Sequence, residues 1–172
     1  MLLKEDEAEE MLGSVKSLRS NLWFLIEDAN ALREHELYWT HSRTGLSLRC
    51  KLDLLATYKD DLVIPDLKTC ADNERFPDQV KRSKLWLQVA HYRAGVKHHY
   101  QREALFWFAV VEKSPPFKVW HYMLDEYALK LADEKYEALL DELKRRIDDN
   151  DWAEPGEDGI QLTVKDCFGW EG

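Results

Sequence analysis

Three side chains, Asp53, Asp66 and Lys68, have the types and the spacing needed to do chemistry together. Asp66 and Lys68 end a short apolar run and lie two residues apart, so in a strand they project from the same face. Asp53 ends an earlier run in which apolar residues alternate. Two carboxylates beside a lysine suit a divalent cation such as Mg²⁺, which prefers oxygen ligands and keeps several waters. The sequence therefore predicts a metal site that could activate water against a phosphate.

Gln88 and Tyr92 form a second candidate pair, about twenty residues further along the chain. They lie four residues apart in a segment with no proline, so they share one face of a predicted helix over 84–99. The spacing alone is common by chance. A buried Gln and Tyr both need hydrogen-bond partners, however. We therefore expect this pair to face the two aspartates and the lysine.

The elements that must position these residues are short strands. The pattern predicts strands over 36–40, 46–56 and 62–69, joined as an antiparallel meander. A turn at 58–61 would make the last two a hairpin and bring Asp53 alongside Asp66. Pro65 falls inside the third strand, and because proline lacks a ladder donor it should lie at an edge or a bulge.

The remaining chain supplies flanking helices and two more strands. We expect a helix over 5–32, strands over 104–112 and 117–124, and a long helix capped by Asp125. The interpretation is one α/β (α+β) domain over 1–172, with a core at 36–124 and a mixed sheet of about five strands. The positions predicted to face inward on the last helix are Leu129, Ala132, Tyr136, Leu139, Leu140, Leu143 and Ile147. In the tail, Leu162, Val164, Phe168 and Trp170 are expected to pack back on the core.

Composition bounds the classes of function. The net charge of −9 disfavours a generally nucleic-acid-binding surface. A local basic strip follows the motif, however, and could bind phosphates if it is not simply a solvated helix face. Its leading members are Lys81, Arg82, Lys84 and Arg93. No apolar run approaches the roughly 20 residues that span a bilayer. Three scattered cysteines favour reduced thiols in a cytoplasm.

Taken in order, these motifs resemble those of the PD-(D/E)XK nucleases. Asp53, then Pro65-Asp66-Leu67-Lys68, then Gln88 and Tyr92 resemble the RecB-type branch. The flanking segments 44–53, 66–76 and 111–117 are similar to RecE-like (exonuclease VIII) enzymes of phages and prophages. The similarity covers about 11–170. A single Asp-x-Lys motif would be weak evidence, but the motifs in this order and with this spacing are strong evidence.

The resemblance implies a restriction-endonuclease-like core and a metal-dependent DNA exonuclease. It implies that Asp53, Asp66 and the backbone carbonyl of Leu67 bind Mg²⁺ or Mn²⁺, with Lys68, Gln88 and Tyr92 completing the catalytic set. It also implies 5′→3′ digestion of double-stranded DNA ends in a bacterial or phage-infected cell. A ring-shaped homo-oligomer and a single-strand annealing partner for recombination would follow.

One departure from the family pattern leaves alternatives open. RecE-like and RecB-like nucleases carry a helical histidine upstream of the first aspartate, in a segment ahead of the part matched here. His35 and His41 are the candidates to replace it. Without a replacement we expect activity only at elevated metal, better with Mn²⁺ than with Mg²⁺. The alternatives are a non-catalytic DNA-binding or assembly subunit and a small restriction or repair endonuclease.

Overall fold

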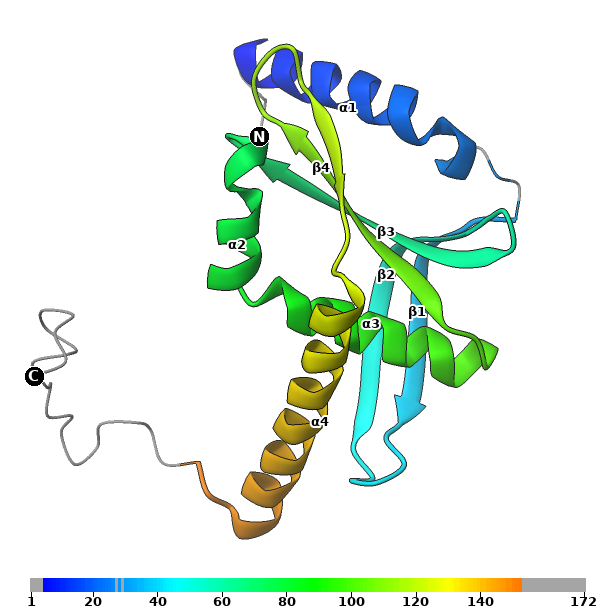
Figure 1. The fold of residues 1–172 in the computed structure, drawn as a ribbon, viewed down its shortest axis with the longest axis vertical. Coiled ribbons are helices and arrows are strands. Elements are labelled where there is room, and N and C mark those ends of the chain that lie inside the picture. The colour runs from blue at the N-terminus through cyan, green and yellow to red at the C-terminus, as the bar shows by residue number, and fades with distance from the viewer. Residues whose placement is uncertain (1–4, 27, 29, 153–172) are drawn as a thin grey trace, which may run out of the picture.

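The alternating apolar residues form one five-stranded sheet in the computed structural model, which describes residues 5–26, 28 and 30–152 (Figure 1). The strands are β1 (Leu32–Thr40), β2 (Ser47–Tyr58), β3 (Asp61–Cys70), β4 (Ala104–Glu112) and β5 (Val119–Tyr122). The α-helices are α1 (Glu5–Ile26), α2 (Phe76–Arg82), α3 (Leu85–Tyr100) and α4 (Glu126–Asp149), with a 3₁₀ helix at Asn73–Arg75. The predicted α+β architecture and mixed sheet are confirmed.

The strand order in the sheet follows the chain, from β1 to β5. β1, β2 and β3 form the predicted antiparallel meander, and β4 pairs antiparallel with β5. β3 and β4 pair in parallel, so the chain between them must cross over, and α2 and α3 make that crossover. This connection lays α3, which carries Gln88 and Tyr92, across the sheet (Figure 1).

Apolar side chains cover both faces of the sheet. On the α3 side the core includes Leu52, Ile64 and Phe108, packed against Val89 and Val96 of the helix. On the other side α1 buries leucines 22 and 25 against Leu54 and Ala109. Figure 1 shows α1 and α3 on opposite sides of the strands. Within the part of the chain that the structure describes, no helix is both long and apolar enough to cross a membrane.

The alternation of β2 breaks at Asp53. Leu52 belongs to the α3-side core and Leu54 to the α1-side core, although residues two apart in a regular strand share a face. In β1 the position between the partners of Leu52 and Leu54 is Glu34, whose φ is +49°. A positive φ is uncommon outside glycine and marks a local kink. Asp53 therefore lies where the strand changes direction.

The β2–β3 hairpin opens into a fork next to this kink. Its ladder runs only from Tyr58↔Asp61 to Ala56↔Val63. The same register, continued, would set Asp53 opposite Asp66, but the strands separate before reaching them. The β2-side edge of β3 is thus open around Pro65, which is buried and in register with Trp107 of β4. The prediction of an edge position for the proline fits this opening.

Several predicted boundaries are wrong. The first helix ends at Ile26 and not at 32, because Leu32 already pairs with Leu55 as the start of β1. The fifth strand is shorter than 117–124, since Phe117 has a φ of +55° and cannot continue a ladder.

On α4, only the narrow stripe of Ala132, Tyr136 and Leu140 is buried. The helix packs on α3 along this spacing of four. The neighbouring stripe is therefore exposed, and the prediction of an inward position was wrong for Leu139 (47% exposed), Leu143 (38%) and Ile147 (46%). The predicted tail contacts of 162–170 lie outside the described residues.

Candidate metal-dependent nuclease site

Asp66 and Lys68 meet on the α3 side of β3, as their spacing predicts. The Lys68 ammonium forms an ion pair with Asp66 Oδ2, and the two side chains are 20% and 5% exposed respectively. Leu67, between them, turns to the opposite side, where it lines a groove with Met11 and Val15 of α1. Of Leu67, therefore, only the backbone carbonyl could bind the same metal ion as Asp66.

The helix α3 brings the second predicted pair to this carboxylate. Gln88 Nε2 donates a hydrogen bond of 2.8 Å to Asp66 Oδ1. The Gln88 side chain also hydrogen-bonds the Tyr92 phenol, one turn further along the helix. Burial raises the pKa of Tyr92, and its hydrogen bond with Gln88 acts in the opposite direction. The four residues thus form one connected polar set.

The environment of Asp66 favours a cation beside its second oxygen. Oδ2 is buried and accepts no hydrogen bond with good geometry from the described residues; its contact is the ion pair with Lys68. Burial raises the pKa of this carboxyl, and Lys68 and Gln88 only partly offset the effect. A buried carboxylate that lacks full solvation is stabilised by a nearby positive charge. The site therefore has the electrostatic character of a cation ligand.

Asp53 is the more exposed acid of the predicted pair. Its charge raises the pKa of Asp66 and also that of Tyr92, although the β2–β3 ladder ends before Asp53 and Asp66 become partners. Within the described part of the chain, no three His, Cys, Asp or Glu side chains converge into a ready metal cage. Two carboxylates with a backbone carbonyl nevertheless suit Mg²⁺, which commonly takes one or two carboxylates and keeps water. The donor set fits such an ion better than it fits zinc, which takes three or four protein ligands, mostly Cys and His.

Comparison with known families agrees with this geometry. The sequence model of the family described as a PDDEXK-like domain of unknown function (DUF3799) matches residues 8–159. This chain belongs to that family. The prediction of a PD-(D/E)XK fold is thereby confirmed, whereas the narrower RecE-like similarity stays a prediction. A search of curated proteins gave no match.

Two solved structures are similar to this chain at low identity. One is the crystal structure of a "Putative exonuclease" from Eubacterium rectale, with a TM-score of 0.52 and 11% identity. The match covers 90% of this chain and 64% of that one, so the chain spans less than two-thirds of its length. The crystal structure of SSO0001 gives a TM-score of 0.40 at 15% identity, covering 76% of this chain and 61% of that one.

Neither candidate histidine joins the PDDEXK-like site. His35 shares a hydrogen bond of 2.9 Å with the Tyr100 hydroxyl at the end of α3. His41 lies in the β1–β2 turn, where its ring contacts Thr44 at 2.8 Å and Glu137 of α4 at 3.2 Å. Both imidazoles are engaged elsewhere. The expectation that one of them replaces the upstream family histidine is therefore not supported by their positions.

The predicted basic strip divides into two parts. Lys81, Arg82 and Lys84 are exposed where α2 ends and α3 begins, four to seven residues before Gln88. Arg93 is different: its guanidinium is paired with Asp133 and Glu103, both at 3.2 Å, and the side chain is only 14% exposed. These ion pairs offset the charge of Arg93, so its position does not support the prediction that Arg93 binds DNA. The sequence pattern shows the cation but not its distant partner on α4.

A groove beside Lys68 was not predicted. It has a volume of about 450 Å³ and lies between α1 and the strands β3 and β4. Its polar lining includes Lys68, Lys113 and Glu10. No local pattern could reveal it, because α1 and β4 are brought together only by the sheet.

Proposed function

We propose that this chain is a metal-dependent deoxyribonuclease that hydrolyses the ends of linear double-stranded DNA. The observation that carries the proposal is the buried Asp66 carboxylate, paired with Lys68 and held by Gln88, at a fork in the sheet beside Asp53. Membership of the PDDEXK-like family supports nuclease chemistry for such an arrangement.

Asp53, Asp66 and the Leu67 carbonyl would hold the divalent metal, Mg²⁺ or Mn²⁺. A bound metal supplies water of lowered pKa and offsets charge on the phosphoryl group. The protein groups have separate tasks. Lys68 places a positive charge where the oxygens of the scissile phosphate gain negative charge, which stabilises the transition state. Gln88 fixes the rotation of the Asp66 carboxylate, and Tyr92 holds the Gln88 amide in turn.

The finer assignment rests on the RecE-like motifs and on the likeness to a "Putative exonuclease". We propose 5′→3′ digestion of duplex ends, acting with a single-strand annealing protein and within a ring-shaped homo-oligomer. The cytoplasm of a bacterium or phage-infected cell is the proposed compartment. The two cysteines within the described residues, Cys50 and Cys70, are free and buried, in keeping with that compartment.

The decisive experiment compares linear with circular plasmid DNA in Mg²⁺ and in Mn²⁺. We expect linear duplex to be degraded from its ends while covalently closed circles stay intact. Cleavage of both would favour a restriction or repair endonuclease. Binding of DNA without cleavage in either metal would favour a non-catalytic DNA-binding subunit and would overturn the proposal.

Metal dependence gives a second expected result. With no histidine of the described residues at the site, we expect metal affinity about 10–100-fold weaker than that of a fully ligated site, by analogy with losses of supporting groups. The rate should therefore keep rising at elevated metal, with Mn²⁺ above Mg²⁺ at equal concentration because Mn²⁺ binds N and O ligands more tightly. A titration of both metals measures this. Full activity at low Mg²⁺ would contradict it.

The three exposed cations beside α3 predict the salt dependence of binding. Lys81→Ala and Arg82→Ala should each weaken duplex binding and reduce the slope of log K against log salt by about one unit per lost contact. Lys144→Ala is the matched control, since this lysine is paired with Asp148 on α4. Fluorescence anisotropy at several salt concentrations measures the slopes. An equal change in the control would show a general charge effect and not a defined contact.

A further inference from the structure

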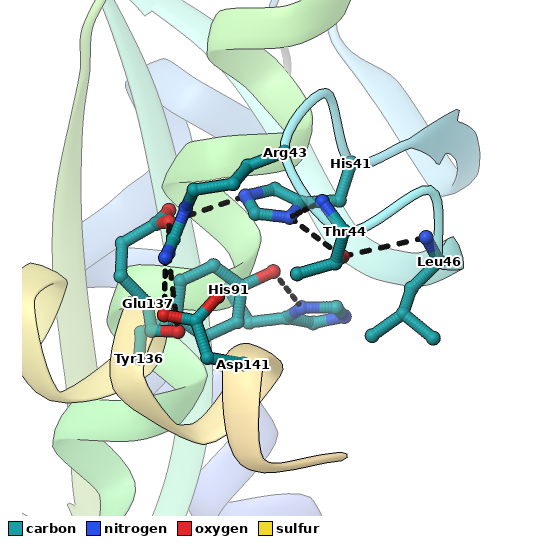
Figure 2. Close-up of polar contacts among 8 residues, drawn as sticks. All are labelled: His41, Arg43, Thr44, Leu46, His91, Tyr136, Glu137 and Asp141. Carbon is teal, nitrogen blue, oxygen red and sulfur yellow. Dashed lines mark hydrogen bonds and ion pairs between the residues drawn. The ribbon is translucent and has the colours of Figure 1, made fainter. Parts of the chain in front are cut away.

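One histidine joins three elements at the back of the site. His91 lies on α3 next to Tyr92, and its Nε2 is 2.9 Å from the carbonyl oxygen of Arg49 on β2. Its Nδ1 is 3.0 Å from the hydroxyl of Tyr136 on α4, a contact that Figure 2 shows. A single side chain thus links the strand that carries Asp53, the helix that carries Gln88 and Tyr92, and α4.

The partners define the state of the ring. A carbonyl oxygen only accepts, so Nε2 of His91 carries the hydrogen and donates to Arg49. Nδ1 then accepts a hydrogen bond from the Tyr136 O–H. Burial lowers the pKa of His91 and raises that of Tyr136 to about 12, so both groups are neutral at pH 7. Every polar atom of this bridge has a partner.

The third element of the bridge is itself anchored. The Arg43 guanidinium, in the β1–β2 turn, contacts Glu137 at 2.5 Å and also pairs with Asp141. His41 of the same turn contacts Glu137 as well (Figure 2). Because Glu137 follows Tyr136 in α4, these contacts hold the Tyr136 hydroxyl against the hairpin end of β2.

Apolar packing sets the distance of α3 from the sheet but not its rotation. A Cβ added to Gly95 would lie 3.0 Å from the Trp39 ring and 3.2 Å from the Cys50 sulfur, so the helix sits close on β1 and β2. Such contacts are non-directional. Hydrogen bonds are directional, and the 2.8 Å bond from Gln88 to Asp66 would be lost if the helix shifted by about 1 Å.

We propose that His91 is a positioning residue for the nuclease site: its bridge from the Arg49 carbonyl to Tyr136 fixes the rotation of α3 on β2, so that Gln88 reaches Asp66. The inference rests on the proposed function where it concerns catalysis. The bridge itself is a property of the fold and is testable without substrate.

The variants separate the two hydrogen bonds from the ring. His91→Phe keeps a ring against Trp39, 5.0 Å away, but removes both bonds. His91→Gln can place an amide N–H near the position of Nε2 and restore the bond to Arg49. Tyr136→Phe removes only the other bond. The control is His99→Phe, because Nδ1 of His99 bonds only Gly95 of its own helix.

We expect His91→Phe to lower kcat by about 10–100-fold, as for losses of groups that orient active-site ligands, with KM changed less than about threefold. His91→Gln should recover most of kcat, and Tyr136→Phe should lie between. His99→Phe should match the wild type. A purely structural histidine would lower the melting temperature without this rescue and without a split between kcat and KM.

The second readout needs no nuclease activity. Cys50 is buried under α3, so its alkylation rate, mapped by peptide mass spectrometry well below the melting temperature, reports how firmly the helix sits on β2. We expect alkylation of Cys50 at least about fivefold faster in His91→Phe, with Cys70 as the internal reference. Unchanged Cys50 protection, or unchanged kcat in an active wild type, overturns the inference. An inactive wild type would refute the proposed function, and Cys50 would still decide the role of the bridge.

Discussion

Lys68→Ala should reduce cleavage of linear duplex by about 10²–10³-fold or more, while the Kd for DNA changes less than about threefold. The ammonium lies beside Asp66 Oδ2 and projects from the same face of β3, and the proposed mechanism assigns it to the negative charge that develops on the phosphate. An interaction made mainly in the transition state lowers kcat when it is removed and leaves ground-state binding nearly intact. Single-turnover cleavage and fluorescence anisotropy on one duplex measure the two effects separately.

Lys113→Ala is the matched control for this result. Lys113 lines the same groove as Lys68, but it has no ion pair with Asp66. It should change binding at most slightly and leave the rate of the bound complex unaltered. If Lys68→Ala instead lost binding and rate in equal measure, the lysine would be a phosphate contact only. Lys68→Met, which keeps the apolar stem, guards against a loss caused by repacking.

The sequence predicts the placement of Asp66 and Lys68 well because one strand carries both residues. Asp66 and Lys68 share a face through the period of two, and Gln88 and Tyr92 share one through the helical period. Each pattern is local, so reading it requires no knowledge of the fold. The same holds for Asp125, whose carboxylate caps α4 by accepting from the Ala128 N–H at 2.7 Å.

Features that depend on distant segments could not be predicted in this way. The kink at Asp53 is visible only from the two cores that Leu52 and Leu54 enter. Arg93 has a basic side chain in a basic stretch, yet its partner Asp133 lies forty residues away. His91 contacts Arg49 of β2 and Tyr136 of α4, and no local pattern around the histidine indicates either partner. Contacts between distant segments decide these cases, and the local sequence pattern does not indicate which distant residues will pair.

Asp66→Asn should abolish metal-dependent cleavage, by about 10²-fold or more, and yet leave the metal-free protein at least as stable as the wild type. Burial raises the pKa of this carboxyl above that of the unfolded chain, despite Lys68 and Gln88. The folded state therefore binds the proton more tightly, so stability falls as the pH rises through the folded pKa. An amide of the same shape removes that cost, and its oxygen can still accept from Gln88. Thermal unfolding in EDTA at pH 7 measures the change.

Asp53→Asn provides the matched comparison for that stability effect. As a proposed metal ligand, Asp53 should also lose cleavage when it is changed to Asn. Because Asp53 is exposed, this variant should gain no stability in EDTA. Adding metal at about 100 times its Kd should stabilise the wild type by about 2.7 kcal/mol, and both variants should lose most of that gain. A metal-free Asp66→Asn protein that unfolds well below the wild type would show that the ion pair with Lys68 outweighs the burial of the carboxylate. An Asp66→Asn protein that still gains the full metal stabilisation would show that the ion binds elsewhere.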